Sequence, residues 1–430
     1  MIITKKIQAG ALQFVLFIGA VVAVLLASFM LLSFTHTHFD KKTDVLISVI
    51  KSADFGLESS LKKEIPLGGS IEISNENDLN IGITVQRDLW GVFEKRTVTT
   101  SHGNSKYVKT ALIGGKDEVE MPALYVNDKQ RPVIMAGNAK ITGDAFLPAQ
   151  GMKMGNIMGL MYNRSSLLYG RQRKSDSLLP KLSRELESQI TKLTRYDFRP
   201  EGEIIDNIPK EGIKNSFQSP TLIIKDRVIR LKNTNLIGNI IVSASYKIIV
   251  EADANLQDVI LLAPEISIEN WVKGQFQAIA TKSITVGKKC ELAYPSVLVV
   301  NKKAALNNSE NNSSSGTLNT QPAIYMDSYS WVGGIVMALD ASTKQQYAPL
   351  IKIDPDAKVV GEVYCNKNLE LKGVVTGNVS TDGFIALEEG SVYQNHLYNG
   401  QINSKNLDTS YAGLLLESRE QNKKVMKWLY

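Results

Sequence analysis

The chain has 430 residues, of which 43% are hydrophobic and 7% aromatic, and its formal net charge is +6 at pH 7. This mild charge includes no dense block of Lys and Arg interleaved with aromatic residues, which argues against nucleic acid as a partner. Cys290 and Cys365 are the only cysteines, so a disulfide framework is excluded. The two thiols either pair, if the fold brings them together, or stay isolated and buried.

The first predicted element is a transmembrane helix over residues 11–34. This stretch reads ALQFVLFIGAVVAVLLASFMLLSF, and Gln13 is its only strongly polar side chain. At about 1.5 Å per residue the helix would be about 36 Å long, enough to cross a hydrocarbon core of about 30 Å. A cleavable signal peptide is the alternative, but its apolar region usually has about 7–15 residues and is followed by a small-x-small cleavage site. We therefore predict a retained anchor whose partner is the lipid bilayer.

The charges on the two sides of the span are nearly balanced, with Lys5 and Lys6 before it and Lys41, Lys42 and two acidic residues after it. Almost all of the chain follows the span. We therefore predict a single-pass protein with a cytoplasmic N-terminus and the bulk of the chain extracytoplasmic.

The helix is expected to continue beyond the membrane, so that residues 1–64 form an anchor and an extended helix. Apolar residues recur at helical spacing on one face: Leu46, Val49, Ile50, Ala53, Leu57 and Leu61. Pro66, followed by Gly68 and Gly69, provides the stop.

The segment QAGALQFVLFIGAVV, with Gly10 in it and basic residues upstream, resembles the N-terminus of type IV pilins and minor pseudopilins. This resemblance implies a long helix packed on a β domain, processing after Gly10, and pilus-like assembly proteins as partners. The chain departs from the pattern at Val15, where most pilins carry Glu when the count starts at Ala11. An ordinary membrane anchor is the alternative.

Residues 65–130 are predicted to form a β-rich junction region. Short alternating apolar runs, separated by turns that carry Asn, Asp and Gly, are typical of strands. They include Ile71 and Ile73, residues 81–85, and a Thr/Val run at 97–100. Trp90 and Phe93 are expected to fill the junction between the anchor helix and the β domain.

A short phrase recurs after residue 130: glycine, then Asp, Asn, Glu or Gln, then an apolar residue. Its copies begin at Gly137, Gly143, Gly155, Gly238, Gly274, Gly361, Gly377 and Gly400. The glycine turns the chain, the polar residue faces outward, and the aliphatic residue faces inward. With apolar runs that begin at Ile248, Ile266 and Ile284, this indicates coils of roughly 18 residues that bury their apolar faces by stacking.

The predicted fold class is therefore mainly β, with an N-terminal transmembrane α-helix followed by a β-helix, or β-solenoid, over residues 131–430. Two insertions are expected: a helical one over 171–197 on the side of the solenoid, and a polar loop over 302–320. The residues from about Thr409 are expected to form a terminal cap. The coils are similar to those of bactofilins, which implies a polymer-forming β-helix, although the anchor and the insertions depart from that family.

Residue types that support catalysis are scarce. The four histidines are His36, His38, His102 and His396. His36 and His38 lie just outside the predicted span, where a metal site is conceivable, but no carboxylate or cysteine cluster accompanies them. Carboxylates could approach one another across neighbouring coils, as in β-helical polysaccharide-degrading enzymes, or could simply be solvated: Glu251, Asp253, Asp258, Glu265 and Glu269. We predict no catalytic residue, no cofactor-binding residue and no metal ligand.

These observations favour a non-enzymatic, membrane-anchored envelope protein with a structural or assembly role, either a pilin-like subunit or a surface scaffold. Its expected partners are other envelope proteins. The alternative is an adhesin or glycan-binding module, which a row of exposed aromatic residues would favour, with Tyr325, Tyr329 and Trp331 as candidates. A β-helical polysaccharide-active enzyme is a third possibility.

Overall fold

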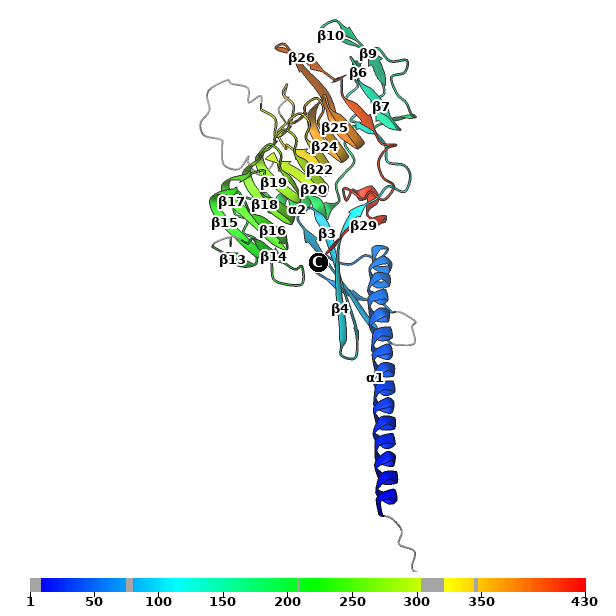
Figure 1. The fold of residues 1–430 in the computed structure, drawn as a ribbon. Helices are drawn as coiled ribbons and strands as arrows, with labels where there is room; N and C mark the ends of the chain where they lie inside the picture. Colours follow the sequence, from blue (N-terminus) through cyan, green and yellow to red (C-terminus); the bar gives the residue numbers. More distant parts are fainter. Residues whose placement is uncertain (1–8, 75–79, 207–208, 210, 303–320, 344–346) are drawn as a thin grey trace, which may run out of the picture.

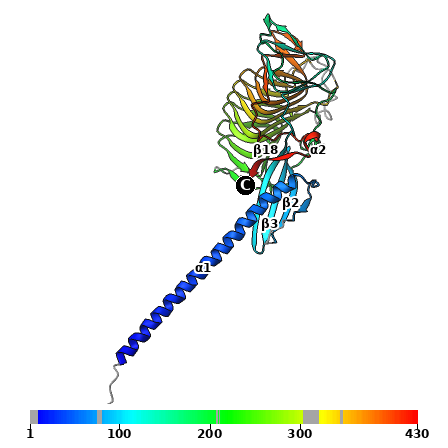
Figure 2. The same ribbon diagram turned by 90° about the vertical axis from the view of Figure 1, so that its right-hand side faces the viewer.

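The computed structural model describes residues 9–74, 80–206, 209, 211–302, 321–343 and 347–430. Three parts follow one another along the molecule (Figure 1): a long N-terminal helix, a small antiparallel sheet, and a stack of parallel strands. The small sheet lies between the free length of the helix and the stack in both views (Figure 2). The fold is therefore mainly β with one long N-terminal helix, as the sequence predicts.

Helix α1 (Ala9–Leu61) is one unbroken element of 53 residues, which at about 1.5 Å per residue gives a length of about 80 Å. No proline interrupts it, and Ala and Leu, which favour helix, recur throughout. The helix ends shortly before Pro66, and Gly68 adopts a φ of +76° in the turn that follows. The chain can therefore reverse and enter the small sheet.

The small sheet has the strand order β1-β2-β3-β4-β29, and all of its pairings are antiparallel. Its strands are β1 (Ser70–Glu72), β2 (Gly82–Trp90), β3 (Phe93–His102), β4 (Ser105–Gly115) and β29 (Lys423–Leu429). The last strand comes from the C-terminus and pairs with β4. The expected terminal cap from Thr409 is therefore wrong, because this segment leaves the stack and completes the small sheet.

Most other strands form the parallel stack. Ile248 pairs in register with Ile266, and Ile266 with Ile284, so the coil length here is 266 − 248 = 18 residues, as predicted. The strands that wind in chain order are β13 (Glu203–Ile205), β14 (Ile213–Asn215), β15 (Leu222–Leu231), β16 (Asn235–Gly238), β17 (Ile240–Val250), β18 (Asn255–Ile268), β19 (Lys273–Val286), β20 (Glu291–Asn301), β21 (Ile324–Met326), β22 (Trp331–Leu339), β23 (Ile351–Ile353), β24 (Lys358–Leu371) and β25 (Val374–Glu388). The predicted polar loop at 302–320 lies, apart from Lys302, outside the described residues.

The end of the stack that is distant from the small sheet is built largely from residues 124–174, which precede the winding strands β13–β25 in sequence. Its strands are β5 (Leu124–Val126), β6 (Val133–Ala136), β7 (Lys140–Thr142), β8 (Ala145–Leu147), β9 (Met152–Met154), β10 (Asn156–Ile157), β11 (Leu160–Met161) and β12 (Gln172–Lys174), joined by β26 (Ser391–Gln394), β27 (His396–Tyr398) and β28 (Gln401–Asn403). Strand β25 pairs in parallel with β5, β28 with β7, and β8 with β12. The chain thus crosses from the small sheet to the far end, returns along the side, and then winds back towards its own earlier coils.

The returning segment includes helix α2 (Arg184–Leu193), which packs on the side of the stack (Figure 2). Ser183 caps the helix by accepting a hydrogen bond from the N–H of Leu186, and Leu186, Ile190 and Leu193 are buried. The external helix is thus confirmed, but it covers only Arg184–Leu193 of the predicted insertion over 171–197. Residues 172–174, expected in the insertion, belong to the stack as β12 because they pair with β8.

Candidate functional site

The first half of α1 has an apolar surface that nothing in the molecule covers. Phe14, Leu25 and Phe34 are each more than 60% exposed. Among the described residues, this is the one helix long and apolar enough to cross a membrane. Hydroxyl groups of this half are satisfied within the helix at Ser28, which donates to Val24 O at 2.8 Å, and at Thr35, which donates to Leu31 O at 2.6 Å. Such internal hydrogen bonding is what a helix requires in lipid.

The second half of α1 is fixed to the small sheet. Val49, Ala53 and Leu57 are fully buried in one apolar cluster with residues of β2, β3 and β4, whereas Leu46, expected on the same face, is 46% exposed. Thr100 of β3 donates a hydrogen bond to the carbonyl of Val49 at 3.0 Å. The predicted extension of the anchor helix beyond the membrane is therefore confirmed, and it packs on the sheet along more than two turns.

A buried cluster of charges, the junction charge cluster, connects the parts of the molecule at this point. It consists of Arg87, Glu94, Arg96, Glu185 and Lys423. The Glu94 carboxylate lies 2.6 Å from Arg96 Nε, 2.9 Å from Arg87 Nε and 2.7 Å from Lys423 Nζ. Arg87 also forms an ion pair with Glu185 of α2. The cluster therefore joins β2, β3, α2 and the C-terminal strand.

The same cluster reaches the end of the anchor helix. Arg96 donates to Ser60 Oγ at 2.8 Å, and Arg87 donates to the carbonyl of Ile65 at 2.8 Å. Burial by itself raises the pKa of the Glu94 carboxyl, but the attraction of Arg96, Lys423 and Arg87 outweighs it, so the pKa lies below its ordinary value. Glu94 is thus charged at neutral pH, as its three cationic neighbours require.

The small sheet is attached to the stack through the turn between β2 and β3. Gln277 of β19 accepts a hydrogen bond from Val92 N–H and donates one to the carbonyl of Trp90, both at 2.9 Å. The indole N–H of Trp90 donates to the carbonyl of Asp258 at 3.0 Å. Trp90 and Phe93 belong to the apolar cluster against the stack and not to the cluster around α1. The prediction that these two residues fill a junction is correct, but the junction lies between the small sheet and the stack and not beside the anchor helix.

Several polar residues of the repeated phrase serve as attachment points for segments that cover the stack. Glu362 is 1% exposed and accepts hydrogen bonds from Leu414 N–H and from Arg419. Gln275 accepts from Lys427 at 2.6 Å, and Asn378 donates to the carbonyl of Pro122 at 2.9 Å. These side chains leave the coil as predicted. They do not reach solvent, because other parts of the chain cover them.

Residues 411–430, the C-terminal strap, hold the stack and the small sheet together. Three of its four cations each pair with a buried carboxylate: Arg419 with Glu362 at 2.8 Å, Lys423 with Glu94 at 2.7 Å, and Lys427 with Asp258 at 2.7 Å. These carboxylates lie on β24, β3 and β18. The spacing of four residues between these three cations is visible in the sequence, but the carboxylates that they pair with are not.

No family model matches this sequence, and no curated protein matches it. Among solved structures, the competence-associated pilin ComZ from Thermus thermophilus is similar at 9% identity with a TM-score of 0.22, over 90% of this chain and 98% of that one. At this TM-score the likeness carries no argument about fold or function. The bactofilin resemblance of the coils therefore stays a prediction.

The four histidines lie on three separate elements. His36 and His38 are exposed on α1, and His102 lies at the end of β3. His396 is half-buried in β27, where burial lowers its pKa and Nδ1 lies 2.6 Å from the carbonyl oxygen of Gln394. In the part of the chain that the structure describes, no three His, Cys, Asp or Glu side chains gather to hold a metal ion.

Three of the candidate carboxylates form ion pairs with cations of other segments. Glu251 forms an ion pair with Arg230, Asp258 with Lys427, and Glu265 with Lys282. These three carboxylates therefore have different cationic partners.

The aromatic trio does not form an exposed row. Tyr325 is half-buried, and its hydroxyl donates to Asp354 Oδ2 at 2.6 Å. Trp331 is also partly buried, and Tyr329 alone is exposed, at 61%. The two cysteines are free and buried in separate surroundings, so they do not pair with each other.

Proposed function

We propose that this protein is a non-enzymatic, single-pass membrane protein of the cell envelope that holds a β-solenoid in a fixed orientation as a structural or assembly component. The observation that carries this proposal is helix α1. One continuous helix presents an exposed apolar half and buries one face of its other half against the small sheet. A helix of this kind transmits the orientation of the membrane span directly to the sheet and the stack.

The buried polar groups support a structural role. Buried ion pairs of the junction charge cluster and the C-terminal strap join the small sheet to the stack, and the same cluster reaches α1 through the hydrogen bond from Arg96 to Ser60 and α2 through the ion pair of Arg87 with Glu185. Three of the carboxylates considered for catalysis, Glu251, Asp258 and Glu265, are engaged in these or in other ion pairs. We place the N-terminus in the cytoplasm and the stack outside it, where a rigid projecting body can contact other envelope proteins.

Extraction and labelling of the full-length protein in its native cells test the anchor and its orientation. The wild-type protein should stay in the membrane pellet after alkaline carbonate washing, and Val22→Arg/Leu25→Arg should be released. A Lys358→Cys variant should react with a membrane-impermeant maleimide in intact cells. Release of the wild-type protein would overturn the anchor, and labelling only after permeabilisation would overturn the orientation.

The intact mass of the protein isolated from its membrane decides between the two forms of the proposal. A chain that starts at Ala11 indicates pilin-type processing after Gly10 and favours a subunit of a pilus-like assembly. A chain that starts at Met1 indicates a permanent anchor and favours a surface scaffold. Chemical crosslinking in intact cells should capture other envelope proteins in either case, and a failure to do so would overturn the assembly role.

A further inference from the structure

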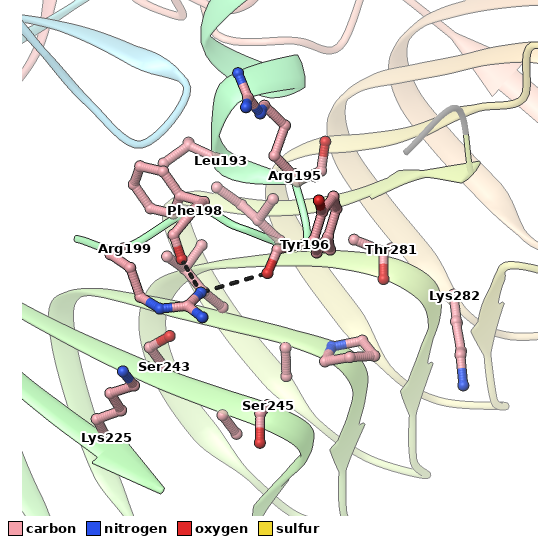
Figure 3. A pocket seen from close by; sticks show the side chains of 16 residues that line it. Leu193, Arg195, Tyr196, Phe198, Arg199, Lys225, Ser243, Ser245, Thr281 and Lys282 are labelled. Atoms are coloured by element: carbon pink, nitrogen blue, oxygen red, sulfur yellow. Dashed lines mark hydrogen bonds between the residues drawn. The ribbon is translucent and has the colours of Figure 1, made fainter. Parts of the chain in front are cut away.

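A cavity of about 350 Å³ lies on the side of the stack where α2 ends (Figure 3). Its floor is formed by β15, β17, β18 and β19, and residues 193–196, 198 and 199 form its roof. Neither the attachment of the anchor nor the C-terminal strap uses this space. Its volume falls at the lower end of the range of small-molecule sites, which is about 300–1,000 Å³.

The floor of the cavity changes from apolar to polar across four coils. Lys225 pairs in register with Ser243, Ser243 with Leu262, and Leu262 with Ile279. Because neighbouring parallel strands lie about 4.8 Å apart, this row of side chains extends over about 14 Å. Leu262 and Ile279 belong to the apolar cluster that packs against α2. Ser243 and Lys225 are not part of this cluster.

The cavity is cationic, and no carboxylate lines it. Arg195 is paired with Asp197, and Lys282 lies 3.6 Å from Glu265. Arg199 and Lys225 have no ion-pair partner among the described residues. Figure 3 shows both of them on the side of the cavity where Ser243 lies.

The Arg199 guanidinium is held in place by the roof itself. Its Nη1 donates to the carbonyls of Phe198 at 2.9 Å and Tyr196 at 3.3 Å. These bonds use one nitrogen and leave the other two available to an anion. A planar guanidinium fixed in this way suits a carboxylate, which can accept two parallel hydrogen bonds from it.

We propose that this cavity binds a small carboxylate that carries an apolar group. The carboxylate lies between Arg199 and Lys225 within reach of the Ser243 hydroxyl, and the apolar group covers Leu262, Ile279 and Phe198. This assigns a ligand site to the side of the solenoid, beyond the structural role proposed above.

The test uses the full-length protein in nanodiscs of zwitterionic lipid and two probes of the same shape. 4-Phenylbutyrate carries the carboxylate, and 4-phenylbutanamide replaces it with a neutral amide. Titration calorimetry should show at least a five-fold preference for the carboxylate. Equal affinity for the two probes, or no binding of 4-phenylbutyrate at millimolar concentration, would overturn the proposal.

Variants locate the binding and control for partitioning into lipid. Arg199→Gln/Lys225→Gln should lose at least ten-fold in affinity for 4-phenylbutyrate and should keep the melting temperature, because both side chains are exposed. Lys358→Gln removes an exposed cation that does not line the cavity, and it should bind like the wild type. An equal loss in both variants would show that only the overall charge matters, which contradicts the assignment.

Discussion

Glu94 shows how single residues determine the junction. Its side chain is completely buried, and its charge is tolerated only because Arg87, Arg96 and Lys423 surround it. Placing a charge in the interior costs several kcal/mol, and removal of one member of a buried ion pair typically destabilises a protein by about 3–5 kcal/mol because the partner stays buried without compensation. Here removal of Glu94 leaves Arg96 of β3 and Lys423 of the C-terminal strap without their ion-pair partner, whereas Arg87 keeps Glu185.

We expect Glu94→Gln to lower the free energy of unfolding by about 3–5 kcal/mol at pH 7. The pKa of Glu94 in the folded protein lies below its ordinary value of 4.5, so its stabilisation is complete above pH 4.5 and is lost as the pH falls through the folded pKa. The wild type should therefore lose stability below pH 4.5, and the variant should lose less in the same range. Urea denaturation of the full-length protein in detergent, followed by tryptophan fluorescence, measures both.

The control for this experiment is Asp197→Asn, which removes an exposed carboxylate paired with Arg195. Exposed ion pairs contribute little to stability, so this variant should unfold like the wild type. If Glu94→Gln were also without effect, the junction charge cluster would not hold the parts together as described.

At the scale of elements, a column of glycines sets the distance between neighbouring coils. Gly334, Gly361 and Gly377 pair directly in register, and their φ angles are +136°, +142° and +141°. A Cβ atom on Gly377 would overlap the carbonyl oxygen of Gly361, and one on Gly361 would overlap that of Gly334. At Gly361 and Gly377 the repeated phrase begins with glycine because both the φ angle and the close approach exclude any side chain.

We expect Gly377→Ala to destabilise the stack, by about 1–3 kcal/mol from the strained backbone alone and by more once the overlap is included. Gly383 lies in the same strand and serves as the matched control. A Cβ atom there would meet its nearest neighbours at 3.6 Å, and the φ angle is not in the left-handed region. Thermal unfolding followed by circular dichroism should show a lower melting temperature for Gly377→Ala only, and equal changes in both variants would contradict the role of the column.

At the scale of the whole molecule, the chain closes on itself. Residues 124–174 cover the last coils of the winding part, and the C-terminal strap returns to the small sheet beside the anchor (Figure 1). The first and last β segments of the chain therefore meet in one sheet. Because coils distant in sequence stack on one another, their contacts form only after large loops have closed, which favours slow and cooperative folding.

A pair of introduced cysteines tests this order of coils. Lys140 and Gln401 are register partners on β7 and β28, and both are partly exposed. Lys140→Cys/Gln401→Cys should form a disulfide under mild oxidation, detected as faster migration in a non-reducing gel. Lys140→Cys/Lys214→Cys should not, because Lys214 lies on β14 at the other end of the stack.

The native cysteines should not interfere with this experiment. Burial raises the pKa of the Cys290 thiol to about 11 and that of the Cys365 thiol to about 12, so both remain protonated and unreactive. A disulfide in the second pair, or none in the first, would show that the coils stack in another order.

The sequence by itself determined the elements whose pattern is local. The apolar run of α1 and its one-faced continuation, the 18-residue spacing of Ile248, Ile266 and Ile284, and the glycines of the phrase all follow from helical periodicity and turn chemistry. Only the tertiary structure decided which coil stacks on which, because the open edge of a parallel strand offers the same backbone groups to any neighbour. It also decided that other segments of the chain cover Glu362, Gln275 and Asn378, and that three cations of the C-terminal strap pair with buried carboxylates. A polar residue that points out of a coil looks the same in sequence whether water or another segment lies above it.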